Sequence, residues 1–197
     1  MTTAVTARDR AKAERTDAIL VAAAELFAAR GYSGVSLEDI GAAVGVSGPA
    51  VYRHFAGKQA LLGALLVGVS ERLIDGGSAV ASVAGSSLAR MRGLVSFHVE
   101  FALGNAEVIR VQDRDLAHLT EESRADVRRL QRAYIELWID SLAALVPDDR
   151  DALRMRVQAC FGLINSTPHS TSTALRRHID TSRLLNAMAL AALQADG

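Results

Sequence analysis

The segment from Ser36 to Leu62 constrains the fold of this chain more than any other stretch. Its sequence, SLEDIGAAVGVSGPAVYRHFAGKQALL, predicts two short helices joined by a tight glycine turn and then the start of another helix. Gly45 suits the turn because glycine adopts positive φ without steric cost. Ser36 and Ser47 precede the two short helices as good N-caps. This layout is that of a helix-turn-helix.

Composition predicts an all-α protein around this motif. Of the 197 residues, 50% are hydrophobic and only three are proline. Apolar residues recur at helical spacing, and alternation over strand lengths is hard to find. A Gly-, Ser- and Ala-rich stretch, Asp75–Ser87, is expected to be a hinge or loop, and STPHSTST (Ser166–Thr173) is expected to separate the last two long helices. The expected helices cover about residues 15–30, 36–44, 47–56, 58–74, 88–103, 105–119, 122–145, 148–165 and 180–193.

The N-terminus is locally basic, although the net charge of the chain is zero. Arg8, Arg10, Lys12 and Arg15 outnumber the nearby anions. Two interpretations of this arm stay open. It lies along phosphates or in a minor groove of DNA, or it is an ordinary disordered terminus.

Several classes of protein are not supported by the sequence. Cys160 is the only cysteine, so no internal disulfide and no cysteine-based zinc site is expected. The N-terminus lacks the apolar core of a signal peptide, and the longest apolar run, Ala60–Val69, is too short to span a bilayer. We expect a cytoplasmic protein that binds no membrane, metal or cofactor.

The second short helix of the motif suits the major groove of DNA. Its first residues are small, so its N-terminus can approach base edges closely. Ala50 would touch a thymine methyl group, and Arg53 would reach guanine O6 and N7. Tyr52, His54 and Lys58 would donate to phosphate oxygens, and the helix N-termini at Ser36 and Lys58 add free amides. The predicted DNA-binding residues are Ser36, Ser47, Gly48, Pro49, Ala50, Tyr52, Arg53, His54 and Lys58.

The alternative for these residues is structural. Tyr52 and His54 would then pack against a neighbouring helix, and Lys58 would be a solvated charge. Each residue alone favours that alternative, whereas their order after a Gly-Val-Ser turn favours DNA.

This segment resembles the N-terminal signature of TetR-family transcriptional regulators. The chain length, the preceding Phe27–Gly31–Tyr32 element and the helical remainder fit the family as well. Pro49 and Ala50 replace a common Gly-Thr pair, which removes one hydroxyl contact to DNA. The matching residues are Ser36, Ile40, Gly45, Val46, Ser47, Val51, Tyr52, His54, Phe55, Lys58 and Leu62.

The resemblance implies a homodimer on a roughly palindromic operator in double-stranded DNA. Binding would repress transcription, and a small-molecule effector would release the protein. Residues 1–57 would be the DNA-binding domain, with a basic arm over residues 1–14. Residues 58–197 would be the effector-binding and dimerisation domain, with a helix over residues 58–74 connecting the two.

The resemblance also implies that the helices over residues 148–165 and 180–193 pair with their mates in a four-helix interface. Apolar stripes at Leu153–Ile164 and Leu184–Leu193 agree with that role. Plain core packing explains such stripes equally well, so both interpretations stay open.

The effector pocket is expected among helices of the second domain. Arg110 and Arg114 share a helix face and would meet a carboxylate or phosphate. The charged run Val111–Leu116 and the Tyr134–Trp138 segment faintly resemble lipid-metabolism regulators of the same family, which implies a fatty acid or acyl-CoA effector. Ordinary core packing is the alternative for most of the aromatic residues. The predicted effector-binding residues are Phe97, His98, Phe101, Arg110, Arg114, Tyr134, Trp138, Phe161 and Asn165.

The leading hypothesis is therefore a ligand-responsive DNA-binding repressor, and two alternatives remain. One is a helical small-molecule-binding protein without operator function. The other is a helix-bundle enzyme, which would need a nucleophile–base pair, a phosphate loop or a metal cluster. The sequence contains no phosphate-loop or nucleophile-elbow motif.

Overall fold

The computed structural model describes residues 6–83, 85–172, 174–175 and 179–195. These residues form helices and turns without a strand, which confirms the all-α prediction. None of the described helices is both long and apolar enough to cross a membrane. The helices are α1 (Ala7–Arg30), α2 (Leu37–Ala43), α3 (Gly48–Tyr52), α4 (Lys58–Val83), α5 (Ser87–Gly104), α6 (Ala106–Asp115), the 3₁₀ turn η1 (Leu116–His118), α7 (Glu121–Ala143), α8 (Arg150–Ser170) and α10 (Thr181–Leu193).

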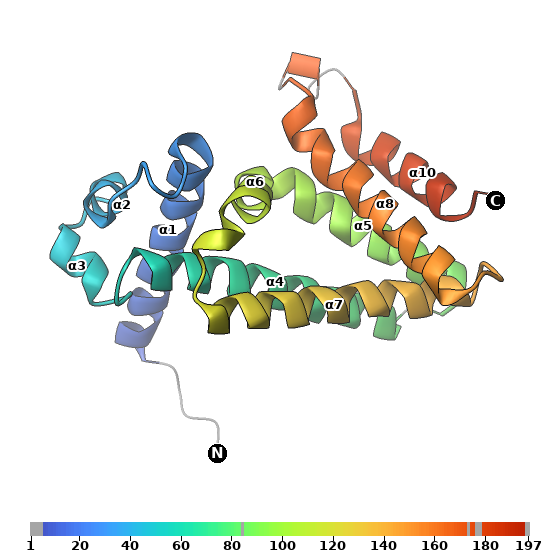
Figure 1. The fold of residues 1–197 in the computed structure, drawn as a ribbon, viewed down its shortest axis with the longest axis horizontal. Helices are drawn as coiled ribbons and strands as arrows, with labels where there is room; N and C mark the ends of the chain where they lie inside the picture. Colours follow the sequence, from blue (N-terminus) through green and yellow to red (C-terminus); the bar gives the residue numbers. More distant parts are fainter. Residues whose placement is uncertain (1–5, 84, 173, 176–178, 196–197) are drawn as a thin grey trace.

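The molecule is elongated, with a small helical head at one end (Figure 1). The head consists of α1, α2 and α3. From it, α4 runs along the length of the molecule beside α7, and α5, α8 and α10 pack together at the other end. The short helix α6 lies against α1, so the second half of the chain contacts the head directly.

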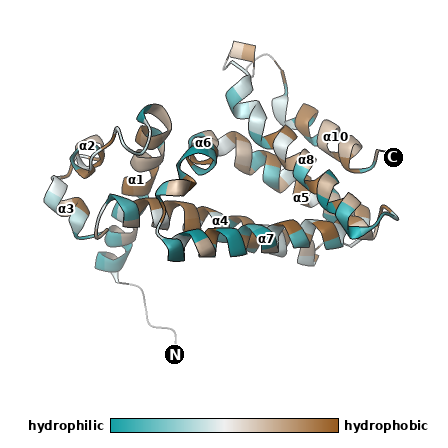
Figure 2. Cartoon of the chain, viewed as in Figure 1, coloured by the Kyte–Doolittle hydropathy of each residue, from teal (hydrophilic) through white to brown (hydrophobic). Residues whose placement is uncertain are grey.

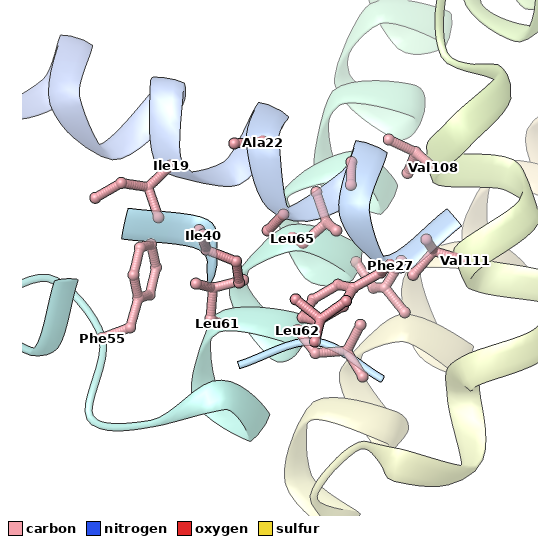
Figure 3. Packing of buried hydrophobic residues seen from close by; sticks show 14 of the residues in the cluster. Ile19, Ala22, Phe27, Ile40, Phe55, Leu61, Leu62, Leu65, Val108 and Val111 are labelled. Carbon is pink, nitrogen blue, oxygen red and sulfur yellow. The ribbon is translucent and has the colours of Figure 1, made fainter. Parts of the chain in front are cut away.

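The first hydrophobic core crosses from the head into the second half of the chain (Figure 3). Ile19 and Phe27 of α1 are fully buried there with Leu61 of α4. Val108 and Val111 of α6 close the same cluster. Packing therefore continues across residue 57, and the domain division at that point stays a prediction.

A second core fills the other end. Trp138 of α7, Leu153 of α8 and Leu185 of α10 are buried in it. Figure 2 shows apolar residues along much of α4, whereas hydrophilic residues dominate the first half of α7. The apolar stripe on α8 belongs to this core, because Val157 and Ile164 are fully buried within the single chain.

The N-terminal arm is helical from residue 7, so α1 begins about eight residues before the predicted start. Thr6 and Asp9 form a capping box. The Asp9 amide donates to Thr6 Oγ1 over 3.2 Å, and the Thr6 amide donates to Asp9 Oδ2 over 3.2 Å. Residues 1–5 of the predicted arm lie outside the described residues. Residues 7–14 belong to α1, and their contact with DNA stays a prediction.

The predicted hinge at residues 75–87 is mostly helix, because α4 continues to Val83. Gly76 and Gly77 look like helix breakers in the sequence, yet they are packing positions. A Cβ atom at Gly77 would lie 2.6 Å from Tyr134 Cε2, and the Phe97 ring occupies the corresponding space at Gly76. Close approach to neighbouring helices therefore outweighs the low helix propensity of glycine.

The predicted break at residues 166–173 also begins late, because α8 runs to Ser170 with Pro168 inside it. Proline lacks the N–H that would bond to the carbonyl four residues earlier. Two hydroxyl groups bond backwards in this turn, Thr167 Oγ1 to the Leu163 carbonyl over 3.0 Å and Thr171 Oγ1 to the Thr167 carbonyl over 2.7 Å. Hydroxyl bonds of this kind, to the carbonyl four residues earlier, often accompany a bend in a helix.

Candidate functional site

A helix-turn-helix forms at the end of the head, as the sequence predicts. Gly45 in the turn has a φ of 69°, in the left-handed region. Gly41 of α2 lets the two helices approach, since a Cβ atom there would lie 2.9 Å from the Val46 carbonyl oxygen and 3.2 Å from Val51 Cγ2. Gly41 therefore has a packing reason.

The outer face of α3 is exposed, whereas its inner face is anchored. Val51 is fully buried and Phe55 is nearly so. Tyr52 is 53% exposed, and Arg53 is exposed beside it. Ser47 lies at the N-cap position, but its hydroxyl makes no capping bond. Of the other predicted residues at this tip, Pro49 is exposed, and Gly48 and Ala50 are half-buried.

Three of the predicted DNA-binding side chains also hold the head together. Lys58 Nζ donates to the carbonyls of Tyr32 and Val35, each over 2.8 Å, and lies 4.4 Å from the Tyr32 ring centroid. His54 Nδ1 lies 2.9 Å from Thr16 Oγ1.

Ser36 serves the head as the N-cap of α2. Its hydroxyl donates to Asp39 Oδ2 over 2.6 Å, and the Asp39 amide donates back to Ser36 Oγ over 3.0 Å. These bonds hold the pKa of Asp39 below its usual value. The structural alternative is thus partly correct for Ser36, His54 and Lys58.

A cavity of about 130 Å³ lies among α4, α5, α6, α7 and α8. His98 is at the centre of the aromatic cluster beside it. The His98 ring centroid lies 4.5 Å from that of Phe161, 5.7 Å from Tyr134, 5.8 Å from Trp138 and 6.3 Å from Phe101. The cavity is lined by Ser70, Leu73, His98, Gln112, Leu130, Gln131, Tyr134, Ile135, Phe161 and Asn165.

Four of the predicted effector-binding residues line this cavity, namely His98, Tyr134, Phe161 and Asn165. Phe101 and Trp138 do not line the cavity. Their rings pack against the lining residues His98 and Phe161, respectively. Ser70, Gln112 and Gln131 also line it and were missed. Gln131 lies one helical turn before Tyr134, which is the signal that sequence analysis could have used.

Besides Phe101 and Trp138, three predicted pocket residues do not line the cavity. Phe97 packs against Gly76 instead. Arg110 Nη2 lies 3.4 Å from His169 Nδ1, where α6 meets α8. Arg114 reaches the carboxyl end of α1 instead of the cavity that the sequence predicted for it.

Arg114 joins α6 to the head. Its guanidinium binds both carboxylate oxygens of Asp115 over 3.1 and 2.9 Å, and it donates to the carbonyls of Phe27 and Ala28. Those carbonyls lie in the last turn of α1, where a cation complements the helix dipole. The Asp115 side chain is only 4% exposed, so this contact is largely removed from solvent on one side.

A surface groove of about 200 Å³ lies between α8 and α10. Leu184 is 48% exposed and Met188 is 44% exposed on α10, although both are apolar. Leu175 and Ile179 are similarly exposed nearby. The groove is lined by Leu163, Thr167, Thr171, Leu175, Ile179, Thr181, Leu184, Leu185 and Met188.

Two family models match the chain over these same regions. The one described as "Bacterial regulatory proteins, tetR family" matches residues 19–65, which include the helix-turn-helix. The one described as "Tetracyclin repressor-like, C-terminal domain" matches residues 84–169, which include most of the helices around the cavity. The chain belongs to the TetR family.

Individual TetR-family proteins are similar along most of their length. The transcriptional repressor KstR2 of Rhodococcus jostii is 26% identical over 157 residues, covering 79% of this chain and 77% of the relative. A TetR-family regulator from Bordetella parapertussis is 27% identical with a TM-score of 0.78, covering 92% of this chain and 94% of that one. At 20% identity, the structure of AibR with isovaleryl coenzyme A and operator DNA shares the fold, with a TM-score of 0.74 and coverage of 90% and 96%.

This TetR-family chain is therefore a DNA-binding, ligand-responsive transcriptional regulator rather than an enzyme. The prediction of a helix-turn-helix regulator is confirmed, and the alternatives of a carrier protein or a helix-bundle enzyme are not supported.

Proposed function

We propose that this TetR-family regulator is a homodimeric repressor that leaves a two-half-site operator when an acyl effector enters the cavity beside His98. The observation that carries the proposal is the burial pattern of α3, whose outer side chains are exposed while its inner side is packed into the head. Tyr52 and Arg53 face outward while Val51 is fully buried beneath them. A helix presented in this way suits insertion into a major groove.

Each side chain at the tip has a proposed role. Arg53 reads guanine, and Ala50 contacts a thymine methyl group. Ser47 offers a hydroxyl that no capping bond uses, and Gly48 and Pro49 permit close approach. Tyr52, His54 and Lys58 bind phosphates, as does the helix N-terminus at Ser36.

The Lys58→Met variant separates the two roles of Lys58. It removes two bonds from a charged donor to the 32–35 loop, so the free energy of unfolding should fall by about 2 kcal/mol. It also removes one phosphate contact, so the slope of log Kobs against log salt should become shallower by about 1. Denaturant unfolding and DNA binding at several salt concentrations measure both, with Arg92→Met on the exposed face of α5 as the control. A loss of stability with an unchanged salt slope would leave Lys58 with the structural role alone.

The proposed dimer uses the apolar groove between α8 and α10. Exposed apolar surface that is continuous over two helices is typical of an interface between subunits. Met188→Glu should place a charge in that interface and convert the dimer to monomer at micromolar concentration. Operator affinity should fall with it, because each half-site would be bound alone.

Light scattering coupled to size-exclusion chromatography measures the mass of the Met188→Glu variant. Val83→Glu is the matched control, since Val83 is 84% exposed at the far end of α4. The proposed interface would be incorrect if Met188→Glu kept the mass of the wild-type protein, or if Val83→Glu dissociated it equally.

The proposed effector is a fatty acid or an acyl-CoA. Phe161 and Tyr134 are apolar surfaces for a carbon chain, with few polar groups beside them. The AibR structure contains isovaleryl coenzyme A, which supports an acyl compound as a ligand of this fold.

Fluorescence anisotropy with labelled DNA from upstream of the protein's own gene tests the whole proposal. We expect tight, salt-dependent binding that weakens on addition of an acyl-CoA. Binding no tighter than to unrelated DNA of the same length would count against an operator there. Unchanged binding with a series of acyl-CoAs and fatty acids would contradict the effector class.

The effector signal is proposed to pass through α6. Gln112 of α6 lines the cavity. Arg114, two residues later on the same helix, donates to carbonyls in the last turn of α1. A shift of α6 on ligand binding would therefore move the head, because Arg114 and the buried Val111 connect it to α1.

A further inference from the structure

Buried polar atoms without hydrogen-bond partners lie in the cavity lining and in the aromatic cluster beside it. His98 Nε2, Asn165 Oδ1 and Trp138 Nε1 are buried, and none of them has a hydrogen-bond partner among the described residues. A buried polar group without a partner is costly, so such groups are rare unless a ligand or water satisfies them. Two of these atoms belong to cavity-lining side chains, His98 and Asn165.

The hydrogen-bond pattern indicates what His98 offers to a ligand. The Tyr134 hydroxyl lies 3.3 Å from His98 Nδ1. Burial raises the pKa of Tyr134 above its usual value, which keeps the phenol protonated. We assign the phenol as the donor in this contact and Nδ1 as the acceptor. Burial also lowers the pKa of His98 to about 4, and the neighbouring Asn165 side chain, which makes no regular hydrogen bond to the ring, opposes part of that shift. The imidazole is therefore neutral near pH 7 with its single proton on Nε2, which makes Nε2–H a buried donor.

No side chain among the described residues that line the cavity carries a charge near pH 7. The polar groups are amides, hydroxyls and the neutral imidazole. A carboxylate brought here would lose its hydration and find no cation, which is strongly unfavourable. The nearest candidates from the sequence, Arg110 and Arg114, are engaged outside the cavity with His169 and with α1.

We propose that the cavity selects a neutral carbonyl group, as in a thioester or ester, over the free carboxylate of the same acid. His98 Nε2–H donates to the carbonyl oxygen, and the Asn165 amide lies beside it. Phe161 and Tyr134 flank the attached carbon chain. This inference rests on the proposed effector role of the cavity and narrows it to acyl thioesters or esters.

The size of the cavity adds a second constraint. Its volume of about 130 Å³ is smaller than the roughly 300–1,000 Å³ of ordinary ligand pockets. Only a short acyl group therefore fits inside. Gln112 and Gln131 are half-buried, and the remainder of a longer molecule would leave past them.

A matched pair of probes tests the selection. Butyryl-N-acetylcysteamine is a neutral thioester, and sodium butyrate is the free acid with the same chain. Trp138 is the only tryptophan, and its ring lies 4.9 Å from that of Phe161, so its fluorescence reports occupancy of the cavity. Calorimetry and fluorescence with the full-length protein at pH 7.5 should show the thioester binding at least about tenfold more tightly than butyrate. Equal or tighter binding of butyrate would overturn the inference.

Two variants of His98 test the donor. His98→Leu removes Nε2–H and should weaken thioester binding about tenfold, because the carbonyl loses its buried donor. His98→Gln places an amide N–H near the position of Nε2 and should retain most of the affinity. Circular dichroism and thermal unfolding show whether each variant is folded. If folded His98→Leu bound the thioester as tightly as wild type, His98 would not be the anchor.

Operator binding distinguishes this inference from the proposed function. Anisotropy with upstream DNA is measured in parallel with each probe. If the thioester binds selectively but leaves operator affinity unchanged, the proposed release mechanism fails and the selection of a neutral carbonyl stands. If neither probe binds, the inference is overturned even where operator binding itself is found.

Discussion

Replacing Arg53 with alanine should lower the affinity for the operator by about 1–3 kcal/mol while leaving affinity for unrelated DNA much less affected. Arg53 is exposed at the carboxyl end of α3, and none of the hydrogen bonds or ion pairs found among the described residues involves its side chain. Its guanidinium is therefore available for the two acceptors of a guanine, O6 and N7. Electrophoretic or anisotropy assays with operator and scrambled DNA of equal length measure the difference.

Arg53→Lys is the matched control for this prediction. It keeps the positive charge but loses the paired N–H groups that bind guanine at two points. We expect the salt dependence of Arg53→Lys to equal that of wild type, with discrimination between operator and scrambled DNA reduced. Equal losses on both DNAs for Arg53→Ala, with full discrimination by Arg53→Lys, would assign Arg53 to a phosphate instead.

Replacing Arg114 with alanine should leave effector binding intact while operator DNA is no longer released. The reason is the position of Arg114, which binds Asp115 on its own helix and the carbonyls at the end of α1. Without it, a movement of α6 would reach the head only through apolar contacts. Trp138 fluorescence measures effector binding, and anisotropy measures release in the same samples.

The same variant should also be less stable. Asp115 would remain buried without its cation, and the last turn of α1 would lose a donor. Because the Arg114 side chain is 42% exposed, solvent moderates the loss, and we expect about 2 kcal/mol in the free energy of unfolding.

The double variant Arg114→Ala with Asp115→Asn removes the uncompensated charge from the Arg114→Ala background. It should recover part of the stability but none of the coupling, which separates the two effects. Normal release of DNA by either variant would show that the signal does not depend on Arg114.

Local sequence patterns were sufficient for the helix-turn-helix. Ser36 is the expected N-cap of α2, where Asp39 completes a capping box, and Gly45 adopts the expected positive φ. These features depend on residues three or four positions apart, so their geometry follows from the backbone itself. The family resemblance followed from the same short segment, and the all-α class followed from the composition of the whole chain.

Longer-range predictions failed where a residue has more than one structural use. Gly76 and Gly77 predicted a hinge, yet the structure uses them to let Phe97 and Tyr134 approach α4. Pro168 predicted a break, yet it lies buried within α8. In both cases tertiary packing decided the outcome, because the neighbouring helix that compensates the weak propensity is distant in the sequence.

The sequence by itself determined the DNA-reading motif and its helical setting, since caps, turns and periodic apolar residues act over a few positions. Only the tertiary structure decided which polar residues face the cavity. His98 and Asn165 come from α5 and α8 and meet there, whereas Arg114 reaches back to α1. Which face of a helix meets which neighbour depends on packing among all the helices, and the spacing of residues along one helix does not contain that information.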